Sequence, residues 1–206
     1  MAISTYAELQ TSIAGWLNRD DLAANIPDFI TLAESSINTS IRHWRMETRA
    51  ETTIDKQFTS IPGDWLSTIR FHLTNNGTTS LDLMSLSSMQ KSREGRANST
   101  GTPTSYCINS AQFEVFPSPD GAYSAILMYY AKIPALSNAN TTNWLLTHYP
   151  DIYLYGALLH TAPYLNDDSR AQTWAALYTS AVQSLKISSN KAKTGGSGLR
   201  LKIGSY

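Results

Sequence analysis

Charged residues are scarce in this sequence: Asp, Glu, Lys and Arg together make up 16% of its 206 residues, whereas about 25% is usual for a soluble domain. A surface with so few charges must be covered by other polar groups, and the sequence is rich in Ser, Thr, Asn and Tyr. Tyr and Trp combine a large apolar body with a polar tip, which suits interfaces that stay partly hydrated. The composition therefore allows two interpretations: the aromatic residues fill an ordinary core, or they line contacts between proteins.

Cysteine is limited to Cys107, which excludes an internal disulfide and a metal cluster held by several thiolates. We expect Cys107 to be a small buried residue on a strand. The longest apolar run, Ala125–Ala131, is far too short to cross a bilayer as a helix, so no membrane partner is expected. The first residues lack the basic segment and apolar stretch of a secretory signal, so we expect the chain to be made and to fold in the host cytoplasm.

Positive charge is concentrated at the C-terminal end of the chain. The formal net charge is zero, which gives no overall signal for binding nucleic acid or a membrane. From Lys186 to Tyr206, however, there are five basic residues and no acidic one, so the rest of the chain must carry a net charge of −5. We expect the basic tail to be a contact element.

Both ends of the chain have helical patterns. Thr5 and Glu8 form a capping-box pattern ahead of apolar residues at helical spacing. A second apolar face runs from Phe29 to Trp44. Near the C-terminal end, Pro150 is expected to open a third helix, and Trp174 is expected on the apolar face of a fourth.

The middle of the chain, residues 46–134, has short runs of β-branched and aromatic residues separated by turn signals. Phe113–Phe116 and Tyr123–Ile133 flank a Pro-Asp-Gly turn and are predicted to form a β-hairpin. Both alternating sets of residues in Tyr123–Ile133 are largely apolar, which indicates a strand covered on both faces. Ser85–Thr104 is polar and contains glycine, so it is predicted to be a long mobile loop.

Together these patterns predict an α+β fold, in which the N- and C-terminal helix pairs form a four-helix bundle with an inserted antiparallel β-region and an extended C-terminal tail. We expect an N-terminal helical hairpin over residues 1–45 and the β-rich region over 46–138. A C-terminal helical hairpin over 139–192 completes the bundle, and residues 193–206 form a flexible tail that docks on a partner.

The tail contains a glycine-rich linker followed by a strict alternation of apolar and basic residues: Leu199, Arg200, Leu201, Lys202 and Ile203. Five alternating residues on a flexible tether are not stable alone. They suit addition as a strand to the edge of a partner's sheet. The alternative is a frayed tail whose alternation is accidental.

The residues that could carry catalysis have simpler explanations. Asp20-Asp21 and Asp167-Asp168 are adjacent carboxylates where helices should begin, so the helix dipole accounts for them. The four histidines are scattered, without metal-ligand spacing. We find no nucleophile elbow and no phosphate-binding loop. No catalytic residue, metal or cofactor is predicted, and an enzyme with a site assembled around His148 or His160 remains an alternative.

Residues 141–168 resemble the C-terminal helical hairpin of bacteriophage head-to-tail adaptors, and are most similar to the tail tubular protein A class of short-tailed phages. The resemblance lies in Asn143–Leu146, in Tyr149–Leu158 and in Pro163–Asp168. Pro27–Glu34, Ile61–Leu66 and Tyr129–Ser137 match further family segments in the same order. His160 and Thr161 depart from the family pattern, because an acidic residue is expected in the middle of this helix. The residues assigned to the family-motif helix and the bundle core are Trp144, Tyr149, Pro150, Asp151, Tyr155 and Trp174.

The resemblance implies a structural, non-enzymatic protein of the virion neck. Such adaptors form a dodecameric ring beneath the portal, extend the DNA channel used in genome ejection, and provide a platform for nozzle or other tail proteins. Double-stranded DNA would pass without specific binding, because an acidic body repels phosphate. Family members dock on the portal partly through a C-terminal extension, which makes Leu199–Ile203 the expected portal-binding strand.

Other functions remain open at this stage. One is a monomeric carbohydrate- or peptide-binding module that uses the aromatic β-region. Another is a different ring protein of the neck or tail, such as a nozzle or stopper.

Overall fold

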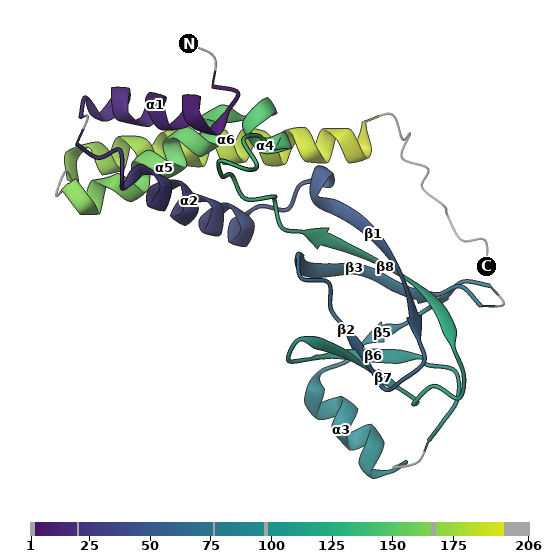
Figure 1. Ribbon diagram of the computed structural model, residues 1–206. Helices are drawn as coiled ribbons and strands as arrows, with labels where there is room; N and C mark the ends of the chain where they lie inside the picture. The colour runs from purple at the N-terminus through teal and green to yellow at the C-terminus, as the bar shows by residue number, and fades with distance from the viewer. Residues whose placement is uncertain (1–2, 20, 76, 97–98, 166–167, 196–206) are drawn as a thin grey trace. The chain divides into compact units, whose positions relative to one another are not determined.

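A computed structural model describes residues 3–19, 21–75, 77–96, 99–165 and 168–195 of the chain (Figure 1). The chain divides into two compact units. The helical unit comprises residues 1–45 and 133–206, and the β-unit comprises residues 46–132. The chain thus leaves the helical unit once, forms the whole β-unit, and returns.

Within the described residues there are six α helices and two sheets of four strands each. The predicted four-helix bundle with an inserted antiparallel β-region is therefore wrong, although the fold is α+β. The prediction failed because it treated the β-region as an appendage of the helices. The β-unit instead has its own core between two sheets, its own helix, and one parallel strand pair.

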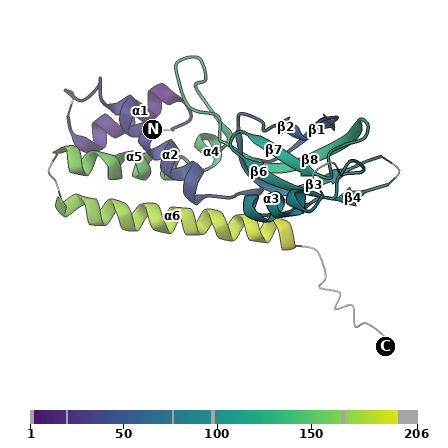
Figure 2. The ribbon, with the colours of Figure 1, turned by 90° about the horizontal axis from the view of Figure 1, so that it is seen from below.

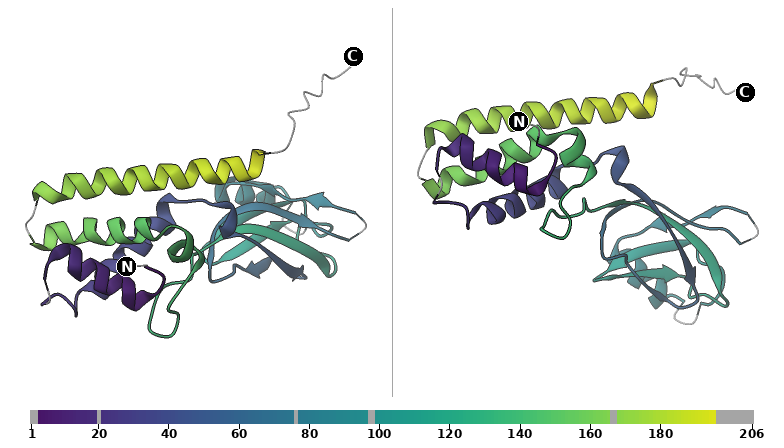
Figure 3. Two further views of the ribbon diagram at one scale, coloured as in Figure 1. Left: turned by 90° about the horizontal axis from the view of Figure 1, so that it is seen from above. Right: turned by 45° about the horizontal axis from the view of Figure 1, so that its top comes forward.

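The helical unit is built around helix α5. Its helices are α1 (Tyr6–Leu17), α2 (Ile26–Ser40), α4 (Trp144–His148), α5 (Pro150–Leu165) and α6 (Asp168–Thr194). Helix α5 is apolar nearly all round, and such a helix must be covered on every side. Helices α1 and α2 pack against one side of α5, and α6 packs against the other (Figures 2 and 3).

Local sequence signals set the ends of the first two helices. Thr5 and Glu8 form the predicted capping box, in which the Thr5 side chain accepts a hydrogen bond from the Glu8 N–H and the Glu8 carboxylate accepts one from the Thr5 N–H. Pro27 lies in the first turn of α2, where its missing N–H costs nothing. Asn18 ends α1 in the left-handed conformation, which asparagine tolerates better than most residues.

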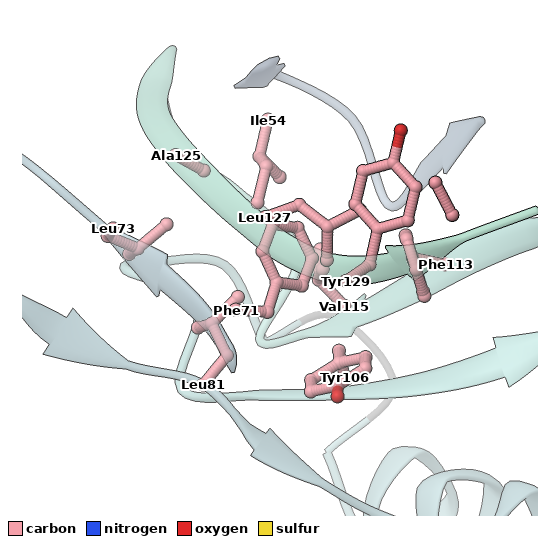
Figure 4. Packing of buried hydrophobic residues seen from close by; sticks show 11 residues of the cluster. Ile54, Phe71, Leu73, Leu81, Tyr106, Phe113, Val115, Ala125, Leu127 and Tyr129 are labelled. Carbon is pink, nitrogen blue, oxygen red and sulfur yellow. The ribbon is translucent and has the colours of Figure 1, made fainter. Parts of the chain in front are cut away.

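The β-unit consists of two facing sheets. One has the order β1 (Glu47–Ile54), β8 (Tyr123–Ala131), β3 (Trp65–Leu73) and β4 (Thr79–Ser80). The other has the order β2 (Phe58–Ser60), β7 (Gln112–Phe116), β6 (Ser105–Asn109) and β5 (Asp82–Leu83). Side chains from both sheets form the core, in which the Phe71 ring contacts the rings of Tyr106 and Phe113 (Figure 4). Cys107 is buried on β6, as predicted.

The predicted hairpin between Phe113–Phe116 and Tyr123–Ile133 is also wrong. Strand β7 pairs with β2 and β6, whereas β8 pairs with β1 and β3, so the intervening turn carries the chain from one sheet to the other. The alternating residues of β8 nevertheless face two environments. Ala125, Leu127 and Tyr129 are buried in the core, and Ile126, Met128 and Tyr130 on the opposite face are only partly buried.

The predicted loop Ser85–Thr104 contains helix α3 (Leu86–Glu94). Ser85 caps the helix by accepting a hydrogen bond from the Ser88 N–H. Met89 is buried with Cys107 and Phe116. Residues 97 and 98 lie outside the described residues.

A buried ion pair fixes α3 to the β-unit. The Glu114 side chain on β7 is almost fully buried, and the Arg93 Nε atom lies 2.7 Å from its Oε1 atom. The same guanidinium donates to the Val115 carbonyl oxygen, and the amides of Gln57 and Asn109 donate to Glu114. Burial raises the pKa of Glu114, but the hydrogen bonds from Gln57, Asn109 and Arg93 outweigh it and hold the pKa below its ordinary value.

We predict that Arg93→Met destabilises the protein by about 3–5 kcal/mol, because it leaves a buried carboxylate without its cation. Urea unfolding at neutral pH measures the change. Lys91→Met on the exposed side of the same helix is the control, with an expected change of about 0.5 kcal/mol or less. Equal effects of the two substitutions would show that the ion pair does not hold α3.

Candidate interaction surfaces

The segment that carries the family resemblance is organised by Asn143. Its side-chain oxygen accepts a hydrogen bond from the Leu146 N–H and so caps α4. Its amide nitrogen donates to the Pro134 carbonyl oxygen at 2.8 Å and to the Tyr153 hydroxyl at 2.7 Å. One side chain therefore joins the start of α4, the interior of α5 and the segment that returns from the β-unit.

Glu34 of α2 extends this arrangement into a buried network. The Tyr153 hydroxyl and the Leu136 N–H both donate to Glu34 Oε1, over 3.2 and 2.8 Å. One turn further along α2, the side-chain oxygen of Asn38 accepts a hydrogen bond from the Ile133 N–H at 2.9 Å. The returning segment is thus bonded to α2 at two points, and the network closes through Tyr153 and Asn143.

Burial dominates the electrostatics of this network. It raises the pKa of Glu34, because the hydrogen bonds from Leu136 and Tyr153 only partly offset the loss of hydration. Burial, followed by the nearby Glu34 charge, also raises the pKa of Tyr153 far above its ordinary value. The phenol therefore remains a proton donor at any physiological pH.

The residues assigned from the family motif occupy different environments in the helical unit. Trp174 is buried, whereas Asp151 is exposed in the first turn of α5. Trp144 stacks on His43 at a ring distance of 5.0 Å. Tyr149 is half-buried, with its hydroxyl 3.1 Å from the Ser188 hydroxyl of α6.

Pro150 and Tyr155 complete that set. Pro150 opens α5, as predicted, and is half-buried. Tyr155 packs edge-on against Trp16 of α1, with ring centroids 5.9 Å apart. The predicted tail strand Leu199–Ile203 lies outside the described residues.

Glu34, Asn143 and Tyr153 were not predicted as a group. Glu34 gave a weak signal, because it stands between Ile30 and Ile37 on the apolar face of α2. An acid at such a position must find buried partners, but nothing in the local sequence says which ones.

The histidines considered for catalysis are separated in the structure. The His148 ring lies beside Tyr149, whereas the His160 Nε2 atom lies 3.2 Å from the Ser36 hydroxyl. Burial lowers the pKa of His160. Among the residues that the structure describes, no three His, Cys, Asp or Glu side chains gather as a metal site. Asp20 and Asp167 fall outside those residues.

A groove of about 230 Å³ opens between α2, α5 and α6. Its floor is at Gly156, where an added Cβ atom would lie 3.2 Å from Cε2 of the Tyr178 ring and 3.4 Å from the Ala33 Cβ atom. A larger residue would therefore have to displace the Tyr178 ring or Ala33. The residues that line it are uncharged or weakly basic: Ala33, Ser36, Ser40, Gly156, Leu159, His160 and Tyr178.

Large apolar side chains are also exposed on the helical unit. Trp16 on α1 is 51% exposed, although one edge of its ring packs against Tyr155. Leu177 and Ile187 are exposed on α6. The stretch of α6 from Ala171 to Leu185 contains no charged residue.

The β-unit presents a regular sheet edge. Strand β1 pairs with β8 over eight consecutive residues without a bulge, and it is the edge strand of its sheet. The neighbouring face has a hollow of about 420 Å³ lined mainly by β1 and β8, with Arg49, Glu51 and Ile126 among its residues. Arg49 and Glu51 form an exposed ion pair beside it. Such an edge is a surface to which another strand can add.

Comparison with known proteins identifies one family. The family model described as "SU10 adaptor protein" matches residues 4–200. No curated protein matches the chain. Within the described residues, no helix is long and apolar enough to span a membrane.

The raised pKa of Glu34 leads to a prediction about pH. A carboxyl group whose pKa is higher in the folded than in the unfolded protein favours folding when it is protonated, and this contribution is lost as the pH rises through the folded pKa. We therefore expect Glu34→Gln to be as stable as the wild type or more stable at neutral pH. As the pH falls towards the range in which glutamate ordinarily titrates, the stability of the wild type should rise relative to that of the variant.

Thermal unfolding of both proteins between pH 7 and pH 4.5 tests this expectation. Asp28→Asn, on the exposed side of α2, should follow the pH dependence of the wild type. Tyr153→Phe should cost about 1–3 kcal/mol, because it removes a donor and an acceptor from buried partners. A stability difference between the wild type and Glu34→Gln that does not change with pH would contradict the assignment.

Proposed function

The chain belongs to the SU10 adaptor protein family, a family of phage head-to-tail adaptors, and on this premise we propose that it forms a dodecameric ring beneath the portal. The chain is accordingly a structural component of the virion at the head-tail junction. The observation that carries the proposal is the family match itself, which extends over residues 4–200 of 206. The finer similarity of residues 141–168 to tail tubular protein A is part of the proposal.

The surface of the helical unit supports ring assembly. Each copy in a ring must bury two surfaces against its neighbours, and burial is costly where charges lose their hydration without gaining partners. The sequence has few charges, and α6 has none from Ala171 to Leu185. Exposed Trp16, Leu177 and Ile187 provide apolar area on the same unit.

Passage of DNA through the ring without specific binding fits the charge distribution. The chain without its basic tail carries a net charge of −5, because the tail holds five basic residues and the total is zero. A channel lined by such a surface repels phosphate and does not retain the genome during ejection.

Docking on the portal is assigned to Leu199–Ile203, on sequence grounds. Helix α6 ends in a basic turn with Lys191 and Lys193, and the glycine-rich linker follows. A flexible tether lets a short strand reach the edge of a partner's sheet. The lower face of the ring would then hold a nozzle or other tail protein.

The alternative of a monomeric carbohydrate- or peptide-binding module has less support. Such a module would need exposed aromatic rings in the β-unit. Phe58 of β2 is exposed, but the rings of Phe71, Tyr106 and Phe113 pack against one another in the core.

We predict that a chain ending at Thr194 binds the portal at least tenfold more weakly than the full chain. Binding is measured by pull-down and by biolayer interferometry with purified portal. Leu201→Pro should have nearly the same effect, because proline removes a ladder N–H and resists central strand positions. Replacing residues 195–198 by four serines is the control, since it keeps a flexible tether.

Two results would contradict these proposals separately. Equal binding by the full and truncated chains would overturn the role of the tail and leave the adaptor role intact. A full chain that ignores the portal and binds a glycan as a monomer would overturn the adaptor role itself.

A further inference from the structure

A closed ring needs two different surfaces on each copy that fit one another, because its interfaces are heterologous. The helical unit offers one surface with a protruding side chain and another with a recess. Trp16 on α1 is the protruding side chain, and the groove above Gly156 is the recess. A contact between these two features presupposes the ring assembly proposed above.

Trp16 and the groove are separate features of the helical unit, because Trp16 is not among the residues that line the groove. Trp16 packs against Tyr155, whereas His160 lines the groove. A contact between Trp16 and the groove can therefore join successive copies, as a ring requires.

The groove has the size and chemistry to accept an indole ring. A cavity of about 150 Å³ is enough to bind benzene, and the groove measures about 230 Å³. Its walls are Ala33, Leu159 and the Tyr178 ring, and its polar atoms belong to Ser36, Ser40 and His160. A buried tryptophan needs a partner for its N–H, and the Ser40 hydroxyl, which donates its own hydrogen to the Ser36 carbonyl oxygen, keeps a lone pair that can accept it.

Trp16 has the properties of a binding anchor. It exposes 51% of its surface. Tryptophan is enriched among the residues that dominate binding energy at interfaces. The α6 side chains beside the groove are uncharged from Ala171 to Leu185, so a neighbouring copy would bury no unpaired charge there.

We propose that Trp16 of one copy inserts into the groove formed by α2, α5 and α6 of the next copy, and that this contact is repeated around the ring. One anchored side chain buries far less than the roughly 1,200 Å² of a stable interface. The isolated chain is therefore a monomer, and the contact forms when the portal places the copies side by side.

The first experiment measures how many adaptor copies assemble on purified portal, by native mass spectrometry and electron microscopy. Trp16→Ala removes the anchor, and Ser40→Trp fills the groove from its rim. Each should lower the number of fully occupied rings at least tenfold. Leu32→Ala, which removes another exposed apolar side chain of the unit, should assemble normally.

Thr39→Trp is the matched control for Ser40→Trp. Thr39 and Ser40 are adjacent and exposed on α2, and each hydroxyl donates to the carbonyl oxygen four residues earlier. Only Ser40 lines the groove. The two variants should unfold at similar temperatures but differ in assembly.

The second experiment tests which surfaces meet, by thiol crosslinking of assembled rings in a Cys107→Ser background. Gly15→Cys, which places a thiol beside Trp16 and keeps the anchor, and Ser40→Cys should crosslink when the two variants are mixed and should not crosslink when either is used alone. Crosslinks in the Gly15→Cys protein alone would show a twofold contact and overturn the proposal.

The outcomes separate this inference from the proposed function. If the wild type forms rings and both Trp16→Ala and Ser40→Trp do so equally well, the anchor contact is wrong and the adaptor role stands. If the wild type forms no ring on the portal, the proposed function and this inference both fail.

Discussion

Helix α5 is apolar on nearly every side, and the helical unit exists because that helix must be covered all round. The covering helices come from both ends of the chain: α1 and α2 precede the β-unit, and α6 follows it. Neither end can therefore form a stable core without the other. The return of the chain at Ile133 becomes a critical step, and the bonds from Glu34, Asn38 and Asn143 fix it.

Two buried carboxylates connect distant parts of the sequence by different physical means. Among the described residues, Glu114 is held by Arg93 and two amides, and these hydrogen bonds lower its pKa. Glu34 is held by an N–H and a hydroxyl, and burial raises its pKa. An ion pair of this kind adds little net stability over an apolar pair, but it penalises any arrangement that leaves the charge unpaired. Glu114 thereby fixes where α3 packs, and Glu34 fixes where the returning segment lies.

The parts of the fold that depend on local signals could be predicted from the sequence, and the parts that depend on distant partners could not. The capping box at Thr5 and Pro150 at the start of α5 are local. Helix α3 was missed because its sequence is polar with one buried residue, Met89, and it is anchored by Glu114 across 21 residues. The turn at Ser118–Gly121 was recognised, but the pairing of β8 depends on β1 and β3. Likewise, the Glu34–Tyr153 bond spans 119 residues, so no local pattern reveals it.

The scarcity of charge and the small size of the proposed Trp16 contact both favour assembly on a template. A contact with a dissociation constant of about 1 mM provides roughly 4 kcal/mol, which leaves the free chain monomeric at cellular concentrations. Partners tethered side by side experience effective concentrations of the same order, about 1 mM, so each contact on the portal is about half formed. Because every copy in a closed ring contacts two neighbours, each neighbour that binds favours the next. Weak, uncharged contacts are thus sufficient for a ring that forms only where it is needed, whereas strong contacts would form rings without a portal.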